Sequence, residues 1–566
     1  MSATTGVHGP EIQAAGPDDL EPPVGWSGPA PWLMAVVLAA GVVLRLVVLF
    51  GPLGRPDSDE VIAGLIARHI GGDGLPAFFW GQHYGGTIEA LPIAASLRIF
   101  GTSVPALRVP TLLLGVVNAV LVWRCGRRVM GEGSARVAGL LAWVWPPAVL
   151  WWGTREQLFY APTVTFGLVA VLLALRLGRA DRGGRAGRAD RADREAGPDH
   201  AAGRWWVVEW AGLGAALGLG WWTSPNISYF LVPVAVALLL PPGRSGRVAV
   251  PPWRGVLVGG AAAVVGALPW LWVNLQSPRM QSLKPAESFH ETGSYPERVV
   301  WYFTHGLPAE LGFREIGTFD WVLGALGVVA YLITATALAI AVVRVLRRRG
   351  SLSAPPFDVV GFLLFPLIMA TIPFVKSQGN LRYLFFVAPF LCLLLARLVG
   401  SRRAAAVLLA AALVVTGLGL WRLQTVSEAS GPPHLVGMLD SLDEVVSVLD
   451  HEGIHAVHAD YWIAYRLTFE TDERIIASPS AGALRYPPYG DAVRNADQAA
   501  WIVTSGSSQE QAMRDRLDEL GVGYRVVPAG EFSVVLTDRN VQPEELPNEA
   551  RAAEGWEMAP PPGESY

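Results

Sequence analysis

The chain has 566 residues, of which 52% are hydrophobic and only 16% are charged, and it contains 22 tryptophans. A soluble protein of this length carries more charge, so the composition indicates a polytopic membrane protein. The 44 basic and 48 acidic residues nearly balance, which argues against a nucleic-acid partner. Cys125 and Cys392 lie on separate predicted spans without disulfide or metal spacing, so neither redox chemistry nor zinc is expected.

Residues 1–30 contain no lysine or arginine, unlike the basic start of a cleavable signal peptide. We expect a disordered cytoplasmic tail there, followed by a transmembrane domain over residues 31–423. Apolar runs of roughly 20 residues are long enough to cross a bilayer. Eleven such spans are predicted, at residues 31–51, 105–123, 134–152, 157–176, 205–223, 225–241, 255–275, 321–343, 357–375, 383–400 and 404–423.

Basic loops set the predicted orientation of these spans. When the spans are threaded alternately, these loops fall on one side, which the positive-inside rule identifies as the cytoplasm. Counting the apolar run Gly86–Phe100 as a span would place every later basic loop outside, so this run is predicted to lie along the outer face. The helix Asp59–Ile70 has one apolar stripe and is expected to lie there too. Its predicted polar side contains Glu60, Gly64 and Arg68.

The composition becomes that of a soluble protein after Leu423. Residues 424–545 are predicted to form a small extracytoplasmic α/β domain, and residues 546–566 a disordered tail. We expect a multi-pass protein of a bacterial plasma membrane, with a second external loop over residues 276–320 that acts as a lid or acceptor platform. In the α/β domain, helices are predicted at 442–452 and 509–520, and strands at 455–459, 474–477, 500–503, 524–527 and 533–537.

Three carboxylates, Asp57, Asp59 and Glu60, crowd at the outer end of the first span. Charged groups at a membrane face are costly to keep dry, so this cluster needs a structural or a chemical reason. Asp57 and Glu60 have the spacing of a helix-capping box, and capping accounts for them as well as catalysis does. Asp59 is not needed for capping and lies in the first turn, where the helix dipole keeps a carboxylate ionised. We therefore predict that Asp59 is a catalytic base.

Further stretches accompany the acidic cluster, namely DEVIAGLIAR at 59–68, FWGQHYGGTIEA at 79–90, and FG at 100–101 with LRVP at 107–110. Over about residues 31–400 this pattern resembles the GT-C glycosyltransferases. Within that superfamily the chain resembles family 39, the polyprenyl- or dolichyl-phosphate-mannose protein mannosyltransferase-like enzymes, and the related lipid A aminoarabinose transferases. The resemblance implies a GT-C fold and inverting transfer of a sugar from a lipid phosphate to an acceptor hydroxyl. It carries the catalytic aspartate onto Asp59.

A departing phosphate needs cationic partners in a partly dry site. Arg382 in the predicted external hairpin is the first candidate, and the resemblance implies an Arg-Tyr pair there with Tyr383. Anchoring of helix ends at the lipid headgroups would equally explain Lys376 and Arg155. His83 lies where several family members have a lysine. The predicted donor-phosphate residues are thus Arg382, His83, Lys376, Arg155 and Tyr383.

External carboxylates and aromatic residues supply the predicted sugar and acceptor contacts. Glu89 and Glu156 could each hold a sugar hydroxyl, or could equally pair with a neighbouring arginine. Most external tryptophans fit an aromatic belt at the membrane surface, with one or two left to stack on a sugar. The predicted sugar or acceptor contacts are Glu89, Glu156, Gln82, Tyr84 and Trp80.

The predicted reaction is a single displacement in which Asp59 accepts the proton of the acceptor hydroxyl while that oxygen attacks the anomeric carbon. Arg382 and His83 would stabilise the departing polyprenyl phosphate. No metal or other cofactor is expected, and the acceptor is a protein, a lipid or a glycan. Two alternatives remain: a lipid or sugar transporter, which inverted repeats would favour, and a non-catalytic scaffold or sensor.

The segment Asp460–Arg466 follows a predicted strand and combines aromatic rings with a carboxylate and a guanidinium. Such a cluster at a strand end could bind a saccharide or the acceptor. It could equally be a helix that packs Tyr461, Trp462 and Tyr465 onto the sheet or the membrane domain. Because every predicted catalytic group precedes residue 400, we expect this domain to present the acceptor and to perform no chemistry.

Overall fold

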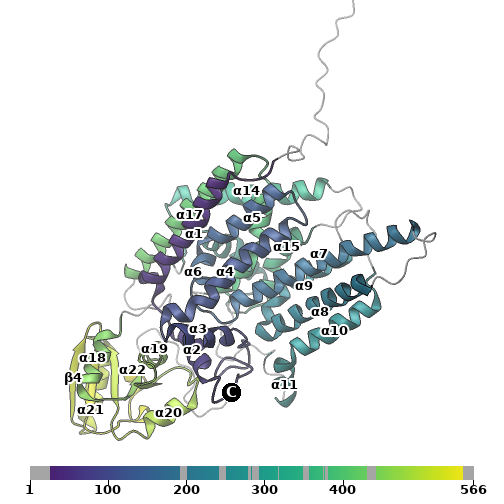
Figure 1. The fold of residues 1–566 in the computed structure, drawn as a ribbon. Helices are drawn as coiled ribbons and strands as arrows, with labels where there is room; N and C mark the ends of the chain where they lie inside the picture. The colour runs from purple at the N-terminus through teal and green to yellow at the C-terminus, as the bar shows by residue number, and fades with distance from the viewer. Residues whose placement is uncertain are drawn as a thin grey trace, which may run out of the picture.

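The computed structural model describes residues 26–190, 200–240, 250–277, 282, 292–316, 318–348, 356–373, 375–376, 380–429 and 441–551, with backbone alone at 179–190, 200–204, 348, 380 and 427–429. Most of the two predicted tails and part of the predicted lid loop lie outside these residues. The described chain consists of a large helical body and a smaller α/β domain that lies beside α2 and α3 (Figure 1).

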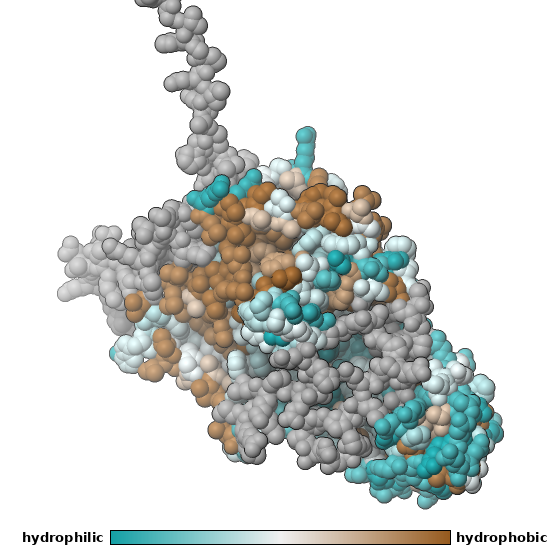
Figure 2. Space-filling view, turned by 180° about the vertical axis from the view of Figure 1, so that it is seen from behind, coloured by the Kyte–Doolittle hydropathy of each residue, from teal (hydrophilic) through white to brown (hydrophobic). Residues whose placement is uncertain are grey.

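Apolar helices build the body, and several begin with a proline in the first turn, where the missing N–H costs nothing. One face of the molecule is largely hydrophobic over this body and hydrophilic over the α/β domain (Figure 2). The helices of the body are α1 (Pro31–Phe50), α4 (Val104–Gly126), α5 (Glu132–Val144), α6 (Pro147–Trp152), α7 (Tyr160–Asp190), α8 (His200–Thr223), η2 (Pro225–Ile227), α9 (Ser228–Leu239), α10 (Trp253–Gly266), α11 (Leu268–Gln276), α14 (Ala325–Arg348), α15 (Phe357–Met369), η5 (Asn380–Val387), α16 (Ala388–Ala396) and α17 (Arg402–Ala429).

A helix or a pair of helices occupies each of the eleven predicted spans. Five helices in the described chain, α1, α4, α7, α14 and α17, are long and apolar enough to cross a membrane, and α10 with α11, bent by 63°, makes six. The other predicted spans are shorter or broken. Pro146 and Pro147 end α5 at Val144, for example, because proline disfavours helix in the residue before it. The count of eleven stays a prediction.

Two helices follow α1 and the short turn η1 (Pro52–Gly54), at the positions predicted for the two interfacial helices. These are α2 (Ser58–His69) and α3 (Ala90–Phe100), which pack against each other. Glu60 and Gly64 are buried, so the expected polar side of α2 is not a solvated face. A Cβ on Gly64 would lie 2.4 Å from the ring of Phe469, because the α/β domain covers this side of the helix.

The second external loop contributes short helices to the body. These are α12 (Tyr295–Trp301), the π-helix η4 (Tyr302–Gly306) and α13 (Leu307–Glu310). Residues 278–281 and 283–291 of this loop lie outside the described part of the chain. The predicted lid is therefore not tested.

The α/β domain contains a five-stranded sheet in the order β2-β1-β3-β5-β4. Strands β2, β1 and β3 are parallel, and β5 and β4 continue the sheet antiparallel. The predicted elements are confirmed, although β2 begins two residues later than expected and α20, η6 and α22 were not predicted. Helix α22 (Asn548–Arg551) falls in the predicted disordered tail and packs against α21, so the tail does not begin at residue 546. The elements are α18 (Asp443–Glu452), β1 (Ala456–Ala459), α19 (Tyr461–Glu470), β2 (Ile476–Pro479), α20 (Pro487–Arg494), β3 (Ala500–Thr504), α21 (Ser508–Glu519), β4 (Tyr524–Ala529), β5 (Phe532–Thr537), η6 (Pro543–Glu545) and α22 (Asn548–Arg551).

The segment Asp460–Arg466 forms the start of α19, which packs against α2. Asp460 caps this helix by accepting a hydrogen bond from the Trp462 amide at 2.9 Å. Tyr461 and Tyr465 join the buried cluster that contains Ile62 of α2. The packing alternative is thus the one that the structure adopts, and it brings the α/β domain to the acidic cluster.

Candidate active site

Glu60 is the centre of a buried ion network. Arg108 donates two hydrogen bonds to its carboxylate, at 2.5 and 2.7 Å, and Arg155 approaches at 3.4 Å. The Glu156 amide adds a further hydrogen bond at 2.7 Å. Burial favours the neutral acid, but the two guanidinium groups outweigh it and lower the pKa of Glu60. No solvent reaches this side chain, so we assign it to holding α2 and not to chemistry.

Asp57 makes half of the expected capping box. Its carboxylate accepts a hydrogen bond from the Glu60 amide at 2.8 Å and binds Arg155 at 2.7 Å. Burial raises its pKa to about 6, against the opposing effect of Arg155. Arg155 is itself fully buried between Asp57 and Glu60, which leaves it no access to a donor phosphate. The roles predicted for Asp57 in catalysis and for Arg155 in phosphate binding therefore do not fit this geometry.

Asp59 alone of the three carboxylates faces open space, with 27% of its side chain exposed. Its Oδ2 lies 3.7 Å from Nη1 of Arg382, whose side chain is 28% exposed. Its Oδ1 accepts a hydrogen bond from the hydroxyl of Tyr461 at 2.5 Å. The structure thus brings together Asp59 and Arg382, the two residues that the sequence ranked first, although they are far apart in the chain. The α/β domain adds Tyr461 to this pair.

Aromatic residues surround Arg382. Its guanidinium carbon lies 5.8 Å from the centroid of the Tyr383 ring. The centroids of the Tyr383 and Tyr160 rings are 6.4 Å apart. Tyr84 of the first external loop interacts electrostatically with Arg382 and Asp59 and is partly exposed. Tyr383 and Tyr84 thus lie near Arg382, while their predicted contacts with donor and sugar stay predictions; the buried Tyr160 was not predicted.

Arg485 brings a second guanidinium group close to Asp59, and sequence reasoning missed it. Its Nε donates to the Tyr461 hydroxyl at 3.3 Å. With its amide oxygen turned toward Arg485, Gln82 accepts two hydrogen bonds at 3.0 Å. Gln82 therefore ties the first external loop to the α/β domain next to the site. The α/β domain was expected to present the acceptor and to perform no chemistry, and this stays a prediction, although Tyr461 of the domain contacts Asp59 directly.

Glu89 and Glu156 are buried and share the hydroxyl of Thr111, which lies 3.2 Å from Glu89 and closer still to Glu156. Burial raises the pKa of Glu156 to about 8, and burial together with the neighbouring Glu156 raises that of Glu89 well above its usual value. No arginine side chain in the described chain pairs with either carboxylate. Neither residue reaches open space, so neither is placed to hold a sugar hydroxyl.

The remaining predicted residues, Trp80, His83 and Lys376, show no contact with Asp59 in the described part of the chain. Trp80 stacks on Tyr486 of the α/β domain, with centroids 4.2 Å apart, which makes it an interdomain packing residue. His83 accepts a hydrogen bond from the Ser282 hydroxyl through its carbonyl. Within the described ranges, no contact connects its imidazole with Asp59 or Arg382, and the ammonium group of Lys376 lies beside Gly293. Their predicted contacts with the donor phosphate stay predictions.

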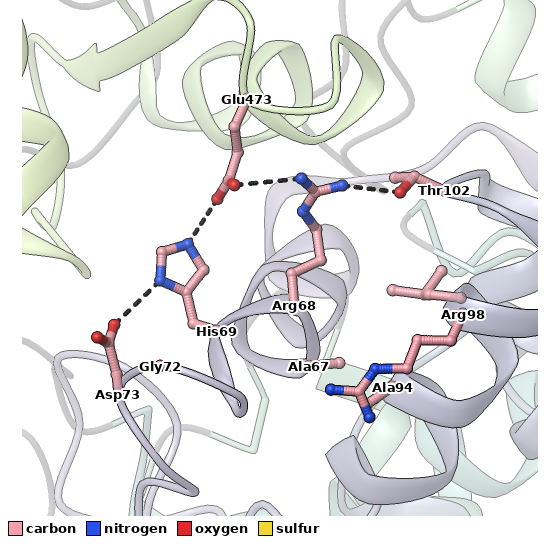
Figure 3. Close-up of a pocket in the computed structure, with 10 residues that line it drawn as sticks. Ala67, Arg68, His69, Gly72, Asp73, Ala94, Arg98, Thr102 and Glu473 are labelled. Carbon is pink, nitrogen blue, oxygen red and sulfur yellow. Dashed lines mark hydrogen bonds and ion pairs between the residues drawn. The ribbon is translucent and has the colours of Figure 1, made fainter.

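A cavity of about 430 Å³ opens between α2, α3 and the α/β domain, at the C-terminal end of α2 (Figure 3). Glu473 bridges the two domains there. It accepts hydrogen bonds from Arg68 at 3.3 Å and pairs with Nε2 of His69 at 2.6 Å, while Nδ1 of His69 lies 3.0 Å from Asp73. These contacts, with the Trp80 stack, hold the α/β domain against α2. Among the described residues, no group of His, Cys, Asp and Glu is arranged to hold a metal.

No family model and no curated protein matches this sequence. Among solved structures, ArnT from Cupriavidus metallidurans in the apo state is similar over 91% of this chain and 99% of its own, with a TM-score of 0.55 and 14% identity. The oligosaccharyltransferase of Archaeoglobus fulgidus matches over 90% of this chain and 75% of its own, with a TM-score of 0.44 and 13% identity. The match to ArnT shows that the chain has the GT-C fold. The narrower resemblance to family 39 stays a prediction.

Proposed function

We propose that this protein is a membrane glycosyltransferase that moves a sugar from a polyprenyl-phosphate donor to an acceptor hydroxyl on the extracytoplasmic side. The observation that carries the proposal is the exposed Asp59 carboxylate, which faces the Arg382 guanidinium across 3.7 Å at the start of α2. A partly exposed carboxylate beside a partly exposed cation suits a reaction that removes a proton and releases a phosphate. The GT-C fold shared with ArnT supports the same class.

The reaction follows from the two groups. Asp59 accepts the proton of the acceptor hydroxyl, whose oxygen attacks the anomeric carbon. The bond from that carbon to the phosphate oxygen breaks, so the polyprenyl phosphate departs as a monoester and the sugar is inverted. Arg382 stabilises the charge that develops on the phosphate, and a charge-assisted hydrogen bond of this kind is roughly twice as strong as a neutral one.

The separation of Asp59 and Arg382 is consistent with this division of work. At 3.7 Å the pair is longer than a hydrogen bond, and about three quarters of each side chain is buried. A substrate phosphate can therefore take the place of Asp59 as the partner of Arg382, in surroundings that screen charge less than bulk water does. We take mannose as the first sugar to test because of the family 39 resemblance.

The test uses purified full-length protein with radiolabelled undecaprenyl-phosphate sugars, one each with mannose, glucose, galactose and 4-amino-4-deoxyarabinose, and a membrane extract as the source of acceptors. We expect one donor to release undecaprenyl phosphate and to pass its label to the extract. If every donor stays intact while the protein moves it between the leaflets of a vesicle, the protein is a lipid transporter and the proposal is wrong.

A further inference from the structure

The α/β domain meets the site through the first turns of two helices. Tyr461 is the first residue of α19, and its carbonyl accepts a hydrogen bond from the hydroxyl of Ser58, the first residue of α2, at 2.6 Å. Its phenol oxygen donates to Asp59 at 2.5 Å. Backbone and side chain of one residue thus both bind the first turn of α2, and the Tyr461 side chain is buried there.

Arg485 fixes the other side of the phenol. Its Nε–H donates to the Tyr461 oxygen at 3.3 Å, and the phenol O–H donates onward to the Asp59 carboxylate. In this series of two hydrogen bonds, both donors point toward the negative charge of Asp59. Each hydrogen bond therefore polarises the other in the same direction. The phenol also lies between Arg485 and Asp59, and no direct ion pair joins these two residues in the described chain. Asp59 therefore receives a hydrogen bond without being neutralised by that guanidinium.

The two oxygens of Asp59 consequently have different surroundings. Oδ1 is occupied by the phenol, whereas Oδ2 lies at 3.7 Å from Arg382, beyond hydrogen-bond distance. A carboxylate with one oxygen held in place cannot rotate freely. The remaining oxygen is then directed to the side where Arg382 would bind the donor phosphate.

We infer that Tyr461, held by Arg485, is a positioning residue that the α/β domain contributes to the transfer reaction, orienting Asp59 so that its Oδ2 accepts the acceptor proton. This inference rests on the proposed function. The proton moves from the acceptor hydroxyl to Oδ2, and Tyr461 keeps its own proton throughout. The base is complete only when the α/β domain is docked on α2.

Tyr461→Phe tests the inference because it keeps the ring and removes the hydroxyl. Tyr489→Phe is the matched control, since the Tyr489 hydroxyl also lies at this interface but binds Glu473. With the undecaprenyl-phosphate sugar that the wild type uses, we expect Tyr461→Phe to lower kcat about 10- to 150-fold, the range for a hydrogen bond to a charged group. The KM for the donor should stay within about twofold, because Tyr461 does not contact the phosphate in this account.

A second comparison separates positioning from mere folding. If Tyr461 acts through Asp59, Tyr461→Phe should cause no further loss of rate in the Asp59→Asn background. Arg485→Lys, which loosens the phenol from the other side, should lower kcat in the same direction and leave binding of undecaprenyl phosphate unchanged. If Tyr461→Phe is not monodisperse, Arg485→Lys tests the same inference in its place.

The outcomes distinguish this inference from the proposed function. Tyr461→Phe with the kcat of Tyr489→Phe, beside an inactive Asp59→Asn, would overturn the inference and leave the proposed function standing. Arg485→Lys with the kcat of the wild type would also overturn it. A wild-type protein that cleaves none of the donors would overturn both.

Discussion

Asp57, Asp59 and Glu60 lie within four residues, yet their surroundings give them different tasks. Two of them are buried against Arg108 and Arg155, and removing such charges from water is repaid only by close, fully bonded partners. Asp59 is partly exposed and bonded on one oxygen only by a neutral phenol. The same chemical group thus belongs to a buried ion network in Asp57 and Glu60 and is a candidate base in Asp59, because the three side chains differ in burial and in their partners.

Arg382 is the residue on which donor binding depends in this account. We predict that Arg382→Ala weakens binding of undecaprenyl phosphate about 10- to 150-fold, the equivalent of about 1.5–3 kcal/mol for a hydrogen bond to a charged group. Scintillation proximity with labelled undecaprenyl phosphate measures the affinity. Arg98→Ala is the control, because Arg98 is exposed on α3 and makes no ion pair within the described chain. Equal losses in the two variants would remove Arg382 from the donor site.

The buried carboxyl of Glu156 should make the stability of the folded protein depend on pH. Burial raises its pKa to about 8, above the ordinary value of 4.5, so the folded protein holds this proton more tightly than the unfolded chain does. Its stabilising effect is complete below about pH 4.5 and is lost as the pH rises through about 8. Glu156→Gln removes the titration, so we expect this variant to melt at a higher temperature than the wild type at pH 9. A melting curve with the same pH dependence in both proteins would contradict this assignment.

At the scale of elements, α2 is the helix that positions the site. Asp57 caps the N-terminus of this helix, and the ion network of Glu60 holds one of its faces. Helix α19 packs against α2 as well. The sequence predicted the helix and its cap because both depend on residues close in the chain. It could not predict Arg108 and Arg155 as partners of Glu60, because their approach depends on how α4 and the α6–α7 turn pack in three dimensions.

The buried network should be costly to break. Glu60→Gln keeps the shape of the side chain but leaves two buried guanidinium groups short of negative charge, so we predict a loss of about 3–5 kcal/mol in stability. Thermal unfolding in detergent, followed by size-exclusion chromatography, measures the change. In Glu132→Gln, by contrast, the substitution affects partly exposed pairs with Arg127 and Arg136 and should cost at most about 1 kcal/mol. A melting temperature no lower in Glu60→Gln than in this control would refute the structural role.

At the scale of the whole molecule, the site forms where two domains meet. Composition and strand pattern predicted both the helical body and the α/β domain, since each rests on local periodicity. The sequence ranked Asp59 and Arg382 first, and the structure places their charged groups 3.7 Å apart, but the sequence assigned no catalytic part to Tyr461 or Arg485. Nothing local marks these two residues, because their role arises only from the docking of α19 on α2.

Docking of the α/β domain depends on Glu473, which binds Arg68 and His69 across the interface. Burial opposes ionisation of this carboxyl, but Tyr489 and His69 outweigh it and lower its pKa, so it is charged at neutral pH. We predict that Glu473→Ala speeds amide hydrogen exchange in α2 and α19 about 5- to 150-fold, as a loss of about 1–3 kcal/mol in docking requires. Glu452→Ala, which breaks a pair with Arg525 within the α/β domain, should leave exchange in α2 unchanged. Unchanged exchange in both variants would show that Glu473 does not hold the domain.

The central claim is that the Asp59 carboxylate takes the acceptor proton during sugar transfer, and Asp59→Asn tests it most directly. The amide keeps the size of the side chain but cannot act as a base, and general-base catalysis contributes about 100- to 10,000-fold. The measurement is the single-turnover rate of label transfer from the undecaprenyl-phosphate sugar, in wild-type and variant proteins that bind undecaprenyl phosphate equally well. The account predicts a rate at least about 100-fold lower in the variant. A variant that transfers the label as fast as the wild type would contradict it.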